Sequence, residues 1–156
     1  MENKMQQEAR VWSRVTGADC PQPRLEQTVP VNAQWVAESI MQLQRSAAVY
    51  CWLAPRVCPG DRERLRAMAR DKQRQMRELG AIYFVQTDRK FCPEAAQPPC
   101  AACVSELLRE QHSAELAAAQ RFSVPVAEEF AETFRCIRQE SQRHAREVLC
   151  VLSRLL

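Results

Sequence analysis

In four stretches of the chain, mostly apolar residues recur at alternating spacings of three and four, which is the pattern of helices that bury one face. Polar side chains interrupt these otherwise apolar faces about halfway along. Helices of this kind bury such faces against one another, so the sequence predicts an all-α, antiparallel four-helix bundle with a polar centre. The expected inward positions are Val36, Ile40, Leu43, Ala47, Tyr50; Leu65, Met68, Lys72, Gln75, Leu79, Ile82; Leu108, Gln111, Glu115, Ala118, Phe122; and Phe130, Phe134, Ile137, Ser141, His144, Val148, Val151.

Three ionisable residues fall on these inward positions, namely Lys72, Glu115 and His144. Buried charges need partners or ligands, because an isolated charge in a core costs several kcal/mol. For Lys72 two interpretations are open: the helix register lets the ammonium reach solvent, or the ammonium pairs with Glu115. Glu115 is expected to be buried, with a surface position like those of Glu106 and Glu110 as the alternative. For His144 we expect a hydrogen-bonded core histidine, with metal binding as the alternative.

Composition supports a single helical domain. A chain of 156 residues with 46% hydrophobic content is long enough for one core. Only 3 glycines and 6% aromatic residues occur, and no stretch shows the β-branched alternation of strands. The formal charge of +3 is too balanced to indicate nucleic-acid binding, which we exclude because interleaved aromatic residues are also missing.

The sequence also limits the expected compartment. The first residues lack the apolar core of a signal peptide, and no run approaches the roughly 18 apolar residues of a membrane span. We therefore expect a cytoplasmic protein with no membrane contact. The chain has 8 cysteines, and a reducing compartment favours free thiols over a disulfide framework.

Prolines and capping residues divide the chain into a leader and a bundle domain. Residues 1–31 should form the leader, with one short helix packed on the outside, and residues 32–156 the bundle. The connection from Gln86 to Ala102 holds three prolines and is long enough for a crossover along the bundle. The four expected helices run from Asn32 to Pro55, from a capping Asp61 to about Val85, over about 103–122, and from the turn at Ser123 and Pro125 to the C-terminus.

Three segments resemble a known family. The text "AAVYCWLA", "LRAMARDKQRQMRELGAIYFVQT" and "IRQESQRHAREVL" is similar to the first, second and fourth helices of the ferritin-like superfamily, above all its rubrerythrin-related bacterial members. With the crossover and the third helix, the resemblance covers about 120 residues. It implies a ferritin-like fold, in which two helices each give a glutamate and the other two each give a Glu-x-x-His pair to hold two iron or manganese ions.

The same resemblance implies that the metal centre has been lost. Only Glu115 and His144 keep a ligand of the family's type, and they are the candidate remnant metal ligands. One carboxylate and one imidazole cannot balance or bridge two ions, and Lys72 adds an ammonium where a cation would sit. We therefore expect no cofactor. The six family ligand positions fall at Leu43 (or Gln44 if the register slips), Lys72, Gln75, Glu115, Ser141 and His144.

A separate group of cysteines offers another chemistry. Cys100 and Cys103 form a C-x-x-C pair at the expected start of the third helix, and Cys92 lies upstream. These residues are a candidate zinc or reactive-thiol site. No second C-x-x-C pair or histidine follows at zinc-finger spacing, so this remains the weaker hypothesis.

Three functional hypotheses follow. The leading one is a ferritin-like domain without catalysis that acts as a structural or interaction module. The second is a rubrerythrin-like oxidoreductase with an altered iron or manganese site that acts on peroxide or oxygen. The third is a zinc or thiol module at the crossover cysteines. The resemblance also implies a possible homodimer through helix faces.

Overall fold

The computed structural model describes residues 31–99 and 103–156. The helix expected within the leader lies outside these residues. The described part is helical, without strands, so the all-α prediction is confirmed. Its elements are α2 (Ala33–Leu53), the short 3-10 helix η1 (Ala54–Arg56), α3 (Pro59–Thr87), α4 (Val104–Arg121) and α5 (Glu128–Leu155). None of the described helices is long and apolar enough to cross a membrane.

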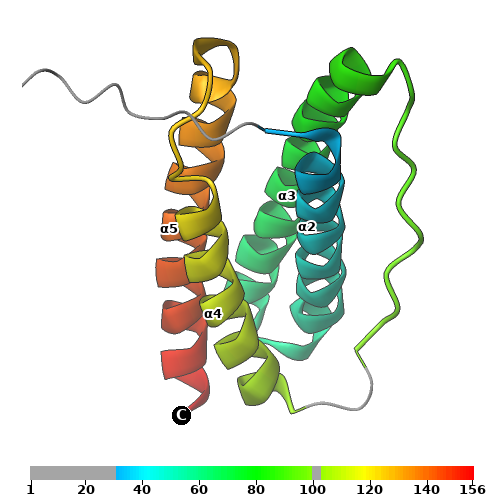
Figure 1. The fold of residues 1–156 in the computed structure, drawn as a ribbon. Coiled ribbons are helices and arrows are strands. Elements are labelled where there is room, and N and C mark those ends of the chain that lie inside the picture. Colours follow the sequence, from blue (N-terminus) through cyan, green and yellow to red (C-terminus); the bar gives the residue numbers. More distant parts are fainter. Residues whose placement is uncertain (1–30, 100–102) are drawn as a thin grey trace, which may run out of the picture.

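The long helices pair in chain order. α2 packs along α3, and α4 packs along α5, while α2 also contacts α4 and α3 contacts α5. In Figure 1 each pair is an antiparallel hairpin, and α3 and α4 run in the same direction. The described residues after α3, up to residue 99, run along the outside of the α2/α3 pair (Figure 1).

The helix boundaries follow local capping chemistry. Asn32 caps α2 as expected, because its side chain accepts a hydrogen bond from the Trp35 backbone N–H at 2.8 Å. The expected cap at Asp61 is wrong. α3 begins at Pro59, whose missing N–H costs nothing in the first turn, and Cys58 takes the cap position. Asp61 lies inside the first turn, where Arg154 from the end of α5 donates to its carboxylate.

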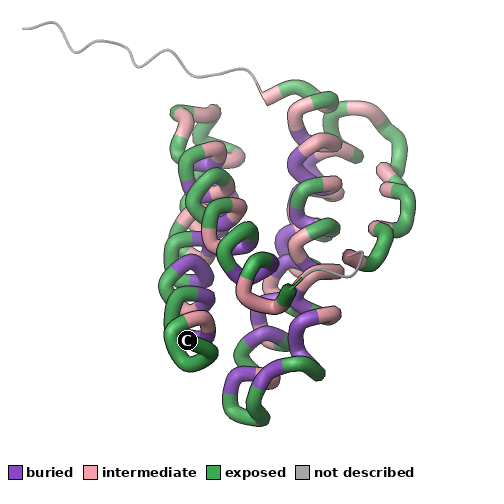
Figure 2. Tube along the Cα trace, turned by 90° about the horizontal axis from the view of Figure 1, so that it is seen from below, coloured by how far each residue is buried: buried purple, intermediate pink, exposed green. Residues whose placement is uncertain are grey.

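The interior has two apolar clusters, one toward each end of the helices. The buried residues of one include Tyr50, Leu65 and Val148, and those of the other include Val36, Leu79 and Phe134. Figure 2 shows the buried positions on the helix faces turned toward one another. Nearly all expected inward positions are buried. The exceptions are Ala118 and Phe130, which are half-buried. Ala119 is buried in place of Ala118, and Phe130 lies in the first turn of α5.

A polar layer lies among these inward positions. We use this name for the buried side chains of Lys72, Gln75, Glu115, Ser141 and His144. They belong to α3, α4 and α5, and each is no more than 1% exposed. Five polar side chains withdrawn from water in this way must satisfy one another or recruit partners nearby.

Candidate functional site

An ion pair joins α3 to α4 in the polar layer. The Lys72 ammonium donates to Glu115 Oε2 at 2.6 Å, and both side chains are 1% exposed. The predicted buried ion pair is therefore confirmed. The alternatives, a solvated ammonium at Lys72 and a surface position for Glu115, are wrong because both helices turn these residues inward.

The second oxygen of the carboxylate is also occupied. The Tyr50 hydroxyl, from α2, donates to Glu115 Oε1 at 2.5 Å. Lys72 in turn lies 3.5 Å from Ser141 Oγ on α5, close enough for a second hydrogen bond. Each of the four long helices thus supplies one side chain to a network around Glu115, in which charge-assisted bonds replace the lost hydration.

The network changes the acid–base properties of its members. Burial by itself would raise the pKa of Glu115, but the adjacent His144 and the Lys72 ammonium outweigh burial and hold the pKa below its ordinary value. Burial and the neighbouring Glu115 carboxylate raise the pKa of Tyr50 well above its ordinary value. Glu115 is therefore the anion of the network, and Tyr50 remains a neutral hydrogen-bond donor.

His144 is a hydrogen-bonded core histidine, as expected. Its ring is fully buried, and Nε2 lies 3.0 Å from Asp71 Oδ2 on α3. Nδ1 faces Glu115 Oε1 at 3.6 Å, beyond hydrogen-bond length, and has no hydrogen-bond partner among the described residues. Arg143 also donates to Asp71, at 2.7 Å, so this carboxylate contacts both the buried His144 and an exposed arginine.

The resemblance also assigns metal-ligand positions to Gln75 and Leu43, and these two side chains do not join the network around Glu115. The Gln75 amide donates to Glu140 Oε2 on α5 at 2.6 Å, and Arg74 donates to the other oxygen of Glu140 at 2.5 Å. Leu43 packs in the apolar cluster that contains Leu79. Contacts therefore link four of the six positions, Lys72, Glu115, Ser141 and His144.

Sequence reasoning missed three partners of the polar layer. Tyr50 stood at an inward position, and the need of a buried hydroxyl for an acceptor was the signal that could have identified it. Asp71 and Glu140 are half-buried and lie outside the expected inward positions, so the helical spacing gave no signal for them.

The donor set does not fit a pair of iron or manganese ions. Both oxygens of Glu115 already accept hydrogen bonds, and the Lys72 ammonium beside this carboxylate would repel a metal cation. Over residues 31–99 and 103–156, no group of three or more histidine, cysteine, aspartate or glutamate side chains is arranged to hold a metal ion. Two ions of this type need bridging carboxylates to neutralise their charge, and this layer offers one carboxylate, already paired.

The proposed cysteine site lies only partly within the described residues. Cys92 and Cys103 are exposed and free, whereas Cys100 lies outside the description. Cys103 precedes α4, and its thiol lies 3.0 Å from Ser105 Oγ. The hydrogen bond with Ser105 and the backbone N–H groups at the helix start lower the pKa of Cys103.

Comparison of the chain with protein-family models, with curated proteins and with solved structures gives no match. The functional proposal therefore rests on the geometry of the polar layer and on the resemblance carried by the three quoted segments.

Proposed function

We propose that the chain is a ferritin-like, rubrerythrin-related four-helix bundle in which the Lys72–Glu115 ion pair provides the charge balance that two metal ions provide in that family. It acts as a non-catalytic structural or interaction module. The observation that carries this proposal is the ion pair itself, which joins two of the six positions that the resemblance assigns to metal ligands, with both side chains 1% exposed.

The helix arrangement supports the fold assignment. α3 and α4 run in the same direction (Figure 1). Two consecutive helices can do so only if the segment between them returns the chain to the end of the bundle where α3 begins. A short loop between these helices would make them antiparallel, as in an up-and-down bundle. The long proline-containing connection is therefore a structural requirement of this topology.

The chemistry of the layer supports the absence of catalysis. A catalytic group must touch its substrate, yet Lys72, Glu115 and His144 have almost no exposed surface. Hydrogen bonds to Ser141, Tyr50 and Asp71 occupy the Lys72 ammonium, the Glu115 carboxylate and His144 Nε2, which leaves only His144 Nδ1 of these groups without a partner among the described residues. The layer instead gives the core directional contacts that an all-apolar core lacks, and such contacts can fix one register of the helices.

The interaction role is supported by apolar side chains on the outer surface. Leu116 on α4 is 49% exposed and Leu149 on α5 is 46% exposed. Contiguous apolar patches on a surface mark contacts with another chain, and single exposed leucines do not, so the variants below test whether these two belong to one interface. A homodimer through α4 and α5 is the form of association that we propose, and light scattering of Leu116→Glu and Leu149→Glu variants tests it.

Elemental analysis of the full chain, expressed in medium supplemented with iron, manganese and zinc, tests the proposal. We expect no metal at stoichiometric levels and no peroxide turnover. About two irons per chain with peroxide-dependent oxidation would establish the oxidoreductase alternative instead. About one zinc per chain, lost on Cys103→Ser replacement together with several kcal/mol of stability, would establish the thiol alternative.

A further inference from the structure

A groove on the outer face of α2 and α3 is lined by none of the residues of the polar layer. It has a volume of about 620 Å³ and is bounded by α2, by α3 and by the first residues of the connection that follows α3. Volumes of a few hundred Å³ are typical of small-molecule sites. The groove is mostly apolar, and none of its lining residues is acidic.

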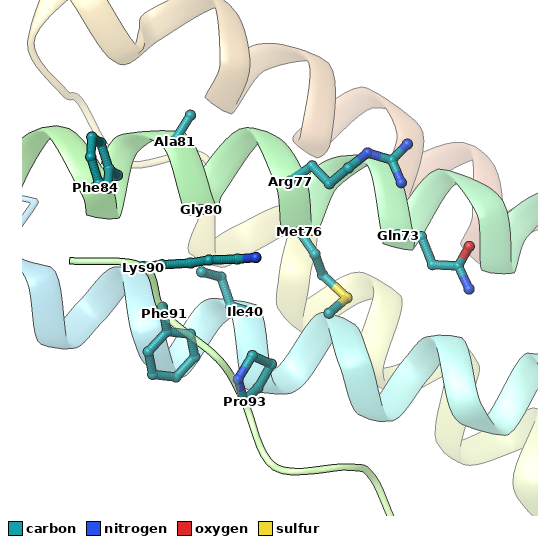
Figure 3. A pocket seen from close by; sticks show the side chains of 10 residues that line it. All are labelled: Ile40, Gln73, Met76, Arg77, Gly80, Ala81, Phe84, Lys90, Phe91 and Pro93. Atoms are coloured by element: carbon teal, nitrogen blue, oxygen red, sulfur yellow. The ribbon is translucent and has the colours of Figure 1, made fainter.

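The groove has a polar end and an apolar end. Figure 3 shows the Lys90 side chain extended along the groove, with its ammonium directed toward the end where Arg77 and Gln73 lie. Phe84 and Phe91 lie toward the opposite end (Figure 3). A ligand that fits this arrangement has an apolar body and one hydrogen-bond-accepting head.

The two cations at the groove have no acidic partner among residues 31–99 and 103–156. Three other basic side chains of α3 are in ion pairs, Arg70 with Glu63, Lys72 with Glu115 and Arg74 with Glu140. Arg77 and Lys90 make no such ion pair with a described residue, and both are exposed. The charge of the groove is therefore positive and uncompensated, which favours an anionic head group.

A glycine keeps the floor of the groove open. Gly80 lies in the interior of α3, where glycine costs about 1 kcal/mol of helix stability relative to alanine. A Cβ built at Gly80 meets no atom within 4 Å, so the surrounding packing does not require glycine there. Gly80 instead lines the groove, between Met76 and Phe84 along the same helix. A side chain at this position would occupy space that a ligand can use.

We propose that this groove binds an amphiphilic carboxylate, with its alkyl chain along Gly80, Phe84 and Phe91 and its carboxylate at Arg77 and Lys90. The guanidinium of Arg77 presents paired N–H donors that suit a planar carboxylate, and the Lys90 ammonium adds a second positive charge. This site is separate from the Lys72–Glu115 layer and does not depend on the proposed function.

Isothermal titration of the full chain with decanoate, below its micelle concentration, tests this proposal. We expect one binding event per chain. Decyltrimethylammonium has the same chain and the opposite charge, so it should bind at least about tenfold more weakly. Butyrate has the same carboxylate head and a shorter alkyl chain, so it should also bind at least about tenfold more weakly than decanoate. Equal binding of all three would overturn the proposal, since it would mean that neither charge nor chain is recognised.

Matched variants locate the site. Gly80→Leu should weaken decanoate binding about tenfold or more without loss of thermal stability, while Gly60→Leu, at an equally open position near the start of α3, should not change it. Lys90→Gln should weaken binding by about fivefold to tenfold, and Arg89→Gln, next to it but outside the groove lining, should have no effect.

Two outcomes would overturn the assignment of the ligand. Unchanged decanoate affinity in both Gly80→Leu and Lys90→Gln would place the binding elsewhere. Absence of decanoate binding, together with a dimer that Gly80→Leu converts to monomers in light scattering, would assign the groove to a second copy of the chain.

Discussion

Lys72 Nζ and Glu115 Oε2 lie 2.6 Å apart, and each side chain is 1% exposed. The two residues are 43 positions apart in the sequence and belong to helices of different hairpins. Their contact therefore links the α2/α3 pair to the α4/α5 pair. A buried pair of this kind stabilises the fold little compared with an apolar pair, but loss of one partner leaves an uncompensated charge in the core.

A double-mutant cycle measures how strongly the stability contributed by Lys72 depends on the presence of Glu115. Lys72→Met and Glu115→Leu should each lower the free energy of unfolding by roughly 3 kcal/mol, because each leaves one buried charge unpaired. The double variant should recover much of that loss. Chemical denaturation of the four proteins gives the coupling energy.

The exposed pair of Arg70 and Glu63 is the matched control on the same helix, with side chains 61% and 65% exposed. Its cycle should give a coupling of no more than about 1 kcal/mol. If the two cycles gave equal coupling, burial would have no part in the Lys72–Glu115 interaction.

The stability contributed by the Glu115 charge should disappear in acid. Its pKa is lowered on folding from an ordinary value of 4.5, so its ionised form stabilises the folded state above that pH. This contribution is lost as the pH falls through the lower, folded-state pKa. The difference in unfolding free energy between the native chain and Glu115→Gln should therefore be large near about pH 7 and shrink below about pH 4.

Denaturant titrations at a series of pH values give this comparison. Glu63→Gln is the control, because Glu63 is exposed and its pKa is lowered chiefly by Arg70. A Glu115→Gln difference that stays constant across the series would show that the folded-state pKa of Glu115 is not lowered.

Cysteine reactivity should differ between Cys103 and Cys136. The hydrogen bond with Ser105 lowers the pKa of Cys103, whereas burial and then the neighbouring Glu132 raise the pKa of Cys136. Because the thiolate is the nucleophile, iodoacetamide at about pH 7.5 should modify Cys103 roughly tenfold faster than Cys136. Peptide mapping by mass spectrometry follows both sites. Ser105→Ala should narrow the difference, and earlier modification of Cys136 would contradict the account.

Helical spacing predicted the buried side of each helix, because a core-facing helix repeats its apolar residues every three to four positions. The same spacing placed Lys72 and Glu115 inside, and the cost of lone buried charges then predicted their contact. The predicted cap of α3 was wrong by three residues, because Cys58 and not Asp61 takes the cap position. End positions depend on local competition, in this case between a helix cap and the Arg154 ion pair.

The partners outside the helical pattern were not predictable from spacing. Gln75 donates a hydrogen bond to Glu140 and does not contact Glu115, and His144 is hydrogen-bonded to Asp71. Both of these acidic residues are half-buried. Their roles depend on the distance between α3 and α5, which no local pattern encodes. The groove beside Gly80 depends in the same way on the path of the connection that contributes Lys90 and Phe91.

Restoring the absent ligands tests the central claim, that the ion pair stands at a former metal centre, most directly. The variant carries Leu43→Glu, Lys72→Glu, Gln75→His and Ser141→Glu together, and Glu115 and His144 complete the family set. A matched control adds Glu115→Ala. Elemental analysis after loading with iron or manganese should find about two ions per restored chain and fewer in the control, with a metal-dependent rise in thermal stability. A restored chain that binds no more metal than the native chain would contradict the claim.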